Sequence, residues 1–216
     1  MKSNYTANRY VLLYAICVMS LTSSLASEPV PAIPQKSTVV QVKKLLYGHE
    51  FKQQYATLVE MGEIAFPAFE AILTNPDVDP EEIQRIFVVL KSVKCDRSRF
   101  VEKAVERLGD SNARVRGSSV ELLACIGSER DSQLLHILLS DGVTSIGYRA
   151  ATTLATIGGN RDLTAFNVWL IISDHKRFTP GKQASHDSLR EHVAKCRDEL
   201  KARLDKEKTQ KSKPKP

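Results

Sequence analysis

Arginine recurs three times along the chain at intervals of about 32 residues. The three residues are Arg97, Arg130 and Arg161. A guanidinium binds a carboxylate or a phosphate through paired N–H groups, so a row of three could hold an acidic partner. Each arginine also has an acidic neighbour in the sequence, such as Asp96 or Glu129, with which it could pair locally. The sequence leaves both interpretations open.

A second candidate is a basic stripe, which consists of Arg99, Lys103 and Arg107. Their spacing of four residues places the three side chains on one face of a helix. At the same repeat interval, Lys103 is followed by His136 and Asn167. We expect these three to form a column across neighbouring helices and, with the stripe and the arginine row, to bind a partner protein. The alternative is an ordinary solvated helix face.

A group of possible metal ligands lies near the C-terminus. Its members are His175, His186, His192 and Cys196. His192 and Cys196 share a helix face, as two zinc ligands can. The spacing of the four matches no zinc motif, however, and Cys196 falls on an apolar helix face, where a cysteine packs as a small hydrophobic residue. We therefore predict no metal.

No catalytic motif stands out in the sequence. The sequence contains no nucleophile elbow, phosphate-binding loop, metalloprotease helix or dinucleotide fingerprint, and no catalytic residue or cofactor is predicted. Trp169, the single tryptophan, is either an aromatic anchor for a partner or a packing residue of the last repeat. We expect Cys95, Cys125 and Cys196 to be structural thiols, with Cys125 at a small packing position inside a helix.

An internal repeat positions all of these residues. The stretch from Leu123 to Asp131 recurs from Leu154 to Asp162, and equivalent leucines stand at positions 58, 90, 123 and 154. A second column of aspartates ends the units, at positions 110, 141 and 174. A period of this length is typical of stacked repeats, in which each unit covers the apolar face of its neighbour. The sequence therefore predicts four units, the first of them degenerate.

Each unit reads as two helices joined by a turn. In the second unit, apolar residues recur at helical spacing, at Ile83, Ile86, Phe87, Leu90 and Val93. This helix opens with Asp79 as N-cap and Pro80 at the first helical position, and a second helix follows from Ser98. In the next two units we expect Gly127 and Gly158 to end the first helix in the left-handed conformation, and Asp131 and Asp162 to cap the second.

This pattern resembles HEAT and HEAT-like repeats of the armadillo-type fold. The best match is Leu108-Gly109-Asp110, followed by Val115 and Arg116 at the start of the next helix. The resemblance covers about residues 49 to 174 and implies an all-α, right-handed α-solenoid of about four helical hairpins. Gln84 and Gly147 replace the arginine in the flanking units, which argues against a continuous ladder of Asp and Arg. Such repeats identify fold better than function.

The segments outside the repeats have distinct compositions. Residues 1–26 combine Lys2 and Arg9 with an apolar run and small residues up to Ala26. This is the pattern of a signal peptide cleaved after Ala26; an uncleaved anchor is the alternative, although the apolar run is shorter than a membrane span needs. Residues 27–37 are predicted to be a linker and 38–174 the repeat domain. Residues 175–205 are predicted to form a loop to 186 and a capping helix from Asp187, whose apolar side covers the end of the stack. The Lys-rich segment 206–216 is predicted to be a disordered tail.

The charge of the chain is concentrated in this tail. Residues 27–200 contain 22 basic and 23 acidic residues, whereas 201–216 contain seven basic and two acidic ones. A nearly neutral body makes nucleic acid an unexpected partner. A basic tail could contact an anionic envelope surface, or simply solubilise the chain.

Taken together, the sequence predicts an exported, periplasmic or secreted, non-enzymatic scaffold that binds another protein in the inner groove of a short solenoid. Two alternatives stay open. Some HEAT-like proteins resemble bilin lyases, which implies an enzyme or an enzyme subunit. The Lys-rich tail, in turn, favours a protein tethered to the cell envelope.

Overall fold

The computed structural model describes residues 36–47, 51–175 and 180–211, and the chain over these residues is all-α, with no strand. The predicted all-α class is therefore confirmed. The predicted signal peptide, nearly all of the linker and the last five residues of the tail lie outside the described residues. None of the described helices is both long and apolar enough to span a membrane.

The elements follow one another as short helices and 3₁₀ turns. In chain order they are α2 (Lys36–Tyr47), α3 (Phe51–Met61), η1 (Gly62–Ala65), α4 (Phe66–Thr74), α5 (Pro80–Ser92), η2 (Ser98–Phe100), α6 (Val101–Glu106), η3 (Arg107–Gly109), α7 (Ala113–Ile126), α8 (Glu129–Ser132), η4 (Gln133–Ser140), α9 (Thr144–Ile157), α10 (Asn160–Asp174) and α11 (Pro180–Lys211).

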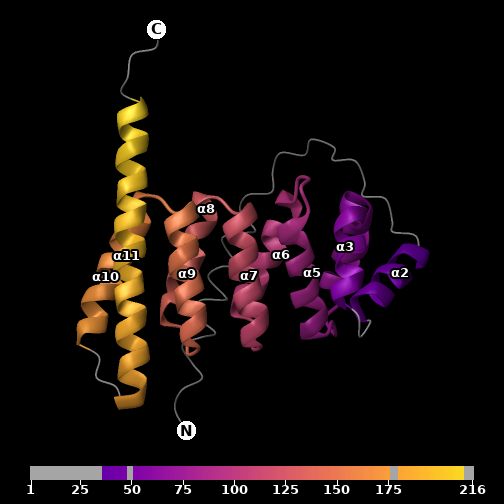
Figure 1. Ribbon diagram of the computed structural model, residues 1–216, viewed down its shortest axis with the longest axis horizontal. Coiled ribbons are helices and arrows are strands. Elements are labelled where there is room, and N and C mark those ends of the chain that lie inside the picture. The colour runs from indigo at the N-terminus through magenta and orange to yellow at the C-terminus, as the bar shows by residue number, and fades with distance from the viewer. Residues whose placement is uncertain (1–35, 48–50, 176–179, 212–216) are drawn as a thin grey trace, which may run out of the picture. The chain divides into compact units, whose positions relative to one another are not determined.

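Consecutive helical pairs pack beside one another. Helix α5 packs on α7, α7 on α9 and α9 on α11 (Figure 1). We call the partner segments the second helices; they are residues 62–74, 98–109, 129–140 and 160–174. The last three pack against this row, since α6 contacts α7, η4 contacts α9, and α10 contacts η4 and α11, whereas the first contacts α2 and α3. The turns between pairs thus lie side by side, and residues about one repeat apart come close together.

Five phenylalanines form the centre of the core. Phe66, Phe69, Phe87, Phe100 and Phe166 are all fully buried. Phe66 and Phe100 come from consecutive second helices, and their rings meet edge to face with centroids 4.9 Å apart, a favoured aromatic geometry. The core is therefore continuous between these two helical segments.

The predicted first helix of the second unit is confirmed as α5. Asp79 is its N-cap and accepts a hydrogen bond from the Glu81 amide at 2.7 Å, with Pro80 in the first turn. All five predicted apolar residues of this stretch, from Ile83 to Val93, are buried. The cap fixes where the helix begins, and the apolar face fixes which side packs inward.

The expected left-handed conformation of Gly127 and Gly158 is wrong, because their φ values are −77° and −71°. Glycine is needed there for space: a Cβ would stand 2.6 Å from the Leu123 carbonyl oxygen at Gly127 and 2.3 Å from the Leu154 oxygen at Gly158. Among the described residues, the glycine with positive φ, +52°, is Gly62, directly after α3, where a side chain would be strained.

The caps of the second helices also differ from expectation. Asp131 and Asp162 stand at the third helical position, not at the N-cap. Asp131 accepts from the Ser128 amide at 2.8 Å, and Asp162 accepts from the Gly159 amide at 2.6 Å. Each carboxylate thus reaches back to the residue before its helix, as in one half of a capping box.

Helix α11 is longer at both ends than the sequence predicts. It begins at Pro180, within the predicted loop, and continues to Lys211, into the predicted tail. Proline is well placed in a first helical turn, so the Pro-Gly pair that indicated a loop opens the helix instead. The apolar side is as predicted, since Leu189, Val193, Cys196, Leu200 and Leu204 are buried. The C-terminal part projects past the other helices (Figure 1).

Candidate functional site

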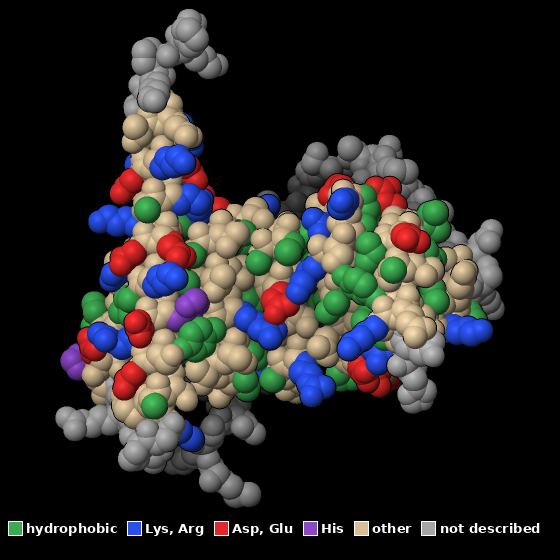
Figure 2. Space-filling view, in the orientation of Figure 1, with side chains coloured by type: hydrophobic (Ala, Val, Ile, Leu, Met, Phe, Trp, Pro, Cys, Tyr) green, Lys and Arg blue, Asp and Glu red, His purple; other side chains and the backbone are tan. Residues whose placement is uncertain are grey.

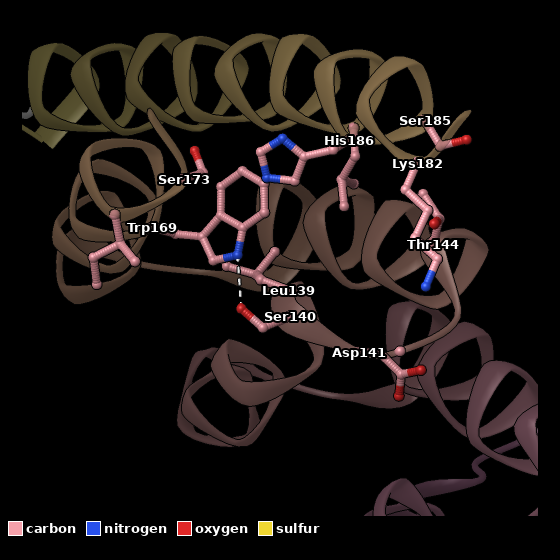
Figure 3. Close-up of a pocket in the computed structure, with 12 residues that line it drawn as sticks. Leu139, Ser140, Asp141, Thr144, Trp169, Ser173, Lys182, Ser185 and His186 are labelled. Atoms are coloured by element: carbon pink, nitrogen blue, oxygen red, sulfur yellow. Dashed lines mark hydrogen bonds between the residues drawn. The ribbon is translucent and has the colours of Figure 1, made fainter. Parts of the chain in front are cut away.

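A cleft of about 450 Å³ lies where η4, the turn before α9, α10 and the first turns of α11 meet (Figure 3). We call it the Trp169 cleft. It is lined by Leu139, Ser140, Asp141, Gly142, Thr144, Trp169, Ile172, Ser173, Lys182, Ser185, His186 and Leu189. Its volume falls in the range of ligand pockets, about 300–1,000 Å³.

Trp169 forms one wall of the cleft. Its indole Nε1 donates a hydrogen bond to the Ser140 hydroxyl at 3.0 Å, which fixes the ring against the end of η4. The His186 ring stacks on it with centroids 6.0 Å apart and planes 28° apart, and Figure 3 shows the two rings lying side by side under α11. Trp169 thus packs against neighbouring elements and also faces a cleft; its role as an anchor for a partner stays a prediction.

Two charged residues line the cleft in different states. Asp141 is held by Arg116 of α7, whose Nε and Nη2 donate to the two carboxylate oxygens, both at 2.9 Å. Burial opposes ionisation of Asp141, but the hydrogen bonds from Arg116 and from the Val143 amide outweigh it, so the pKa of this carboxyl lies below its ordinary value. Lys182 forms no ion pair with any residue that the structure describes. Its ammonium is therefore a charge that no described residue of the lining neutralises.

Arg116 and Asp141 also connect neighbouring units. Arg116 Nη1 donates to the carbonyl oxygens of Asp110 and Ser111 at 2.8 and 3.2 Å, so one guanidinium joins the turns that end the second and third units. The ion pair between Arg116 and Asp141 is of the kind that a ladder of Asp and Arg would contain, and the sequence predicts that this ladder is interrupted. Gly147 replaces the next arginine, and a Cβ there would stand 3.1 Å from a Leu189 methyl carbon.

The predicted basic stripe is paired within the chain. Arg99 Nε lies 2.8 Å from a Glu70 carboxylate oxygen, and Lys103 Nζ lies 3.1 Å from one of Glu106. Arg107 lies 3.5 Å from Asp110 and donates to the Leu73 carbonyl at 3.3 Å. An acidic partner would have to displace these carboxylates before it could bind the stripe.

His136, from the predicted column, belongs to a buried network. Its Nε2 contacts the Asp162 carboxylate, which also accepts from the Ser132 hydroxyl at 2.9 Å. Burial opposes ionisation of Asp162, yet the bonds from His136, the Gly159 amide and Ser132 lower the pKa of this carboxyl. The network joins η4 to the start of α10. Asn167, the last residue of the column, is exposed on α10.

The three recurring arginines do not share one environment. Arg97 folds back on the end of α5 and donates to the Leu90 and Lys91 carbonyls at 2.9 and 3.1 Å, which satisfies carbonyls that the helix end leaves open. Arg130 and Arg161 are exposed and form no ion pair in the described ranges. Of the three recurring arginines, Arg130 and Arg161 therefore remain available to a partner.

The histidines and cysteines near the C-terminus do not assemble into one site. His192 Nε2 lies 3.4 Å from Cys196 Sγ and 3.0 Å from Thr152 Oγ1, whereas His186 stacks on Trp169. Among the described residues, no group of three His, Cys, Asp or Glu is placed to hold a metal ion. Burial raises the pKa of the Cys196 thiol to about 11, so it stays protonated.

The three described cysteines are free. Cys125 is exposed, which contradicts its predicted packing position. It stands on the side of α7 that turns away from the core, as Thr156 does in α9.

Exposed apolar side chains gather on the second helices. Of the eight large apolar residues that are exposed in the described part of the chain, five lie there: Ile64, Ile137, Val168, Ile171 and Ile172. None lies on α5, α7, α9 or α11. Those helices instead present charges of both signs (Figure 2), among which Glu121 contacts Lys91 and Arg149.

The sequence missed most of the Trp169 cleft. Trp169 and His186 stood out by residue type, but Ser140, Lys182 and Ser185 carried no signal, and the first turns of α11 were predicted to be a loop. No family model matches this chain, and no curated protein is significantly similar to it. The site is therefore interpreted from its own geometry.

Proposed function

We propose that this chain is a non-enzymatic protein-binding module, built as a HEAT-like, right-handed α-solenoid of about four hairpins. Support for the repeat architecture comes from the packing of α5, α7, α9 and α11 in chain order and from Arg116, which joins consecutive turns as the repeat motif implies. Export of the chain through the segment 1–26 remains part of the proposal.

The observation that carries the binding function is the uneven distribution of exposed apolar residues. Ile137 is 73% exposed and Ile171 is 62% exposed, and both lie on second helices. Scattered apolar residues are normal on any surface, but a concentration on one set of helices indicates a face that a partner covers. The partner is therefore expected on the second helices, next to the column of Lys103, His136 and Asn167.

The experiment is affinity purification of the chain from its native cells, followed by mass spectrometry, with two variants run in parallel. The first, Ile137→Asp/Ile171→Asp, places charges on the proposed face and is expected to lose the partner. The second, Val40→Asp, changes an apolar residue of α2 that is 66% exposed and is expected to retain it.

Two results would refute this proposal. Loss of the same proteins by the Val40→Asp control would show that capture reflects general stickiness, and equal capture by all three chains would place binding elsewhere. A Lys103→Glu/Arg107→Glu variant then shows whether the partner binds the apolar face or the basic stripe. Only a partner that binds the stripe should be lost by this variant.

A further inference from the structure

Among the residues that the structure describes, the Trp169 cleft combines an apolar wall with a cation that has no ion-pair partner. Leu139, Trp169, Ile172 and Leu189 supply the wall. The cation is Lys182, whose side chain extends from α11 toward the part of the cleft that Thr144 lines (Figure 3). The acidic residue of the lining, Asp141, has its charge balanced by Arg116 at 2.9 Å. A ligand that complements this lining is apolar at one end and anionic at the other.

The cleft opens onto the face that we propose a partner covers. Ile172 lines the cleft and is 51% exposed. On α10 it stands four residues after Val168, so both lie on one side of the helix. Ser140, which accepts the Trp169 hydrogen bond, stands one helical turn after Ile137. The wall of the cleft is thus continuous with the apolar surface of the second helices.

We propose that the Trp169 cleft receives a large apolar side chain of the partner protein, next to an Asp or Glu whose carboxylate meets the Lys182 ammonium. This inference rests on the proposed protein-binding function and specifies the chemistry of the partner segment. Tryptophans are frequent centres of binding energy in protein interfaces, where the partner excludes water from around them. Trp169 is already held in place by Ser140 and His186, so it needs no reordering on binding.

The chain supplies its own reporter for the test, because Trp169 is its single tryptophan. We would titrate the full chain with three blocked tetrapeptides, acetyl-Gly-Leu-Glu-Gly-amide and its Leu-Gln and Ser-Glu counterparts, and follow tryptophan emission at low salt. We expect saturable binding of the Leu-Glu peptide in the millimolar range. The Leu-Gln peptide should bind about three- to fivefold more weakly, and the Ser-Glu peptide about tenfold or more.

Two variants locate the carboxylate. The Lys182→Gln chain should bind the Leu-Glu and Leu-Gln peptides about equally, because it has no ammonium to attract the peptide carboxylate. The two peptides and the two chains together form a double-mutant cycle, which measures the interaction between Lys182 and the peptide Glu. Lys201→Gln changes an exposed lysine of the same helix outside the cleft and should leave the preference intact. Neither lysine packs in the core, so both variants are expected to fold.

The outcomes separate this inference from the proposed function. Absence of saturable binding, or a Glu preference that persists in Lys182→Gln, overturns the assignment of the cleft. If the chain still captures a partner that Ile137→Asp/Ile171→Asp loses and Lys182→Gln retains, the binding module stands without the cleft. If capture fails in every form, the proposed function falls, and with it the identification of the peptide as part of a partner protein.

Discussion

Replacement of Arg116 by glutamine tests how much the bonds from Arg116 to the turns at Asp110 and Asp141 contribute to stability. The side chain of Arg116 is 16% exposed and that of Asp141 is 6% exposed. Glutamine removes both charged hydrogen bonds to Asp141 and those to the Asp110 and Ser111 carbonyls, and it leaves a buried carboxylate without its cation.

The expected cost is about 2–3 kcal/mol of unfolding free energy. Removal of one partner from a fully buried ion pair costs about 3–5 kcal/mol, and the partial exposure of Arg116 lets water replace some of the loss. For a chain of this size each kcal/mol shifts Tm by about 2–4 °C, so we expect Tm to fall by about 5–10 °C at pH 7.

The assay is thermal and urea unfolding of the wild type, Arg116→Gln and Arg149→Gln, followed by circular dichroism. Arg149 is the matched control: it also pairs with a carboxylate of a neighbouring helix, Glu121 at 2.8 Å, but it is 43% exposed. Exposed pairs contribute at most about 1 kcal/mol. If Arg116→Gln destabilises the chain no more than Arg149→Gln does, the reasoning from burial is wrong.

Three further predictions concern the two buried aspartates, two of the cysteines and Gly62. Folding lowers the pKa values of Asp141 and Asp162, so their contribution to the free energy of unfolding is present above the unfolded pKa of about 4. This contribution is lost as pH falls through the folded pKa values. The Tm should therefore drop below about pH 4, and it should drop less in Asp162→Asn. Cys125 should react with a thiol reagent at pH 8 in the folded chain while Cys196, with a pKa of about 11, reacts only after unfolding; modification of both at one rate, mapped by mass spectrometry, would contradict this. Gly62→Ala should cost about 1–2 kcal/mol because φ is +52°, and an unchanged urea midpoint would argue against the left-handed turn.

Local signals were reliable where a residue acts on its own helix. Asp79 and Pro80 predicted the start of α5, and the spacing from Leu189 to Leu204 predicted the buried side of α11, because a cap and an apolar periodicity operate within one or two turns. Gly127 and Gly158 were also recognised as helix ends. The predicted left-handed conformation of these glycines was wrong. Glycine is required because the Leu123 and Leu154 carbonyls approach closely, and this approach depends on how the chain leaves each helix.

The sequence by itself determined the all-α class, the start of α5 and the buried side of α11, because these follow from helical periodicity and from capping residues near in the chain. The tertiary structure alone decided which cations remain available. It paired Arg99 with Glu70 and turned Arg97 onto the end of α5, and it brought Lys182 to the wall formed by Trp169. Such pairings join residues that are distant in sequence, or depend on the exact approach of neighbouring helices. Charge and spacing along the chain do not encode them, because each ion pair is set by side-chain geometry in the packed structure.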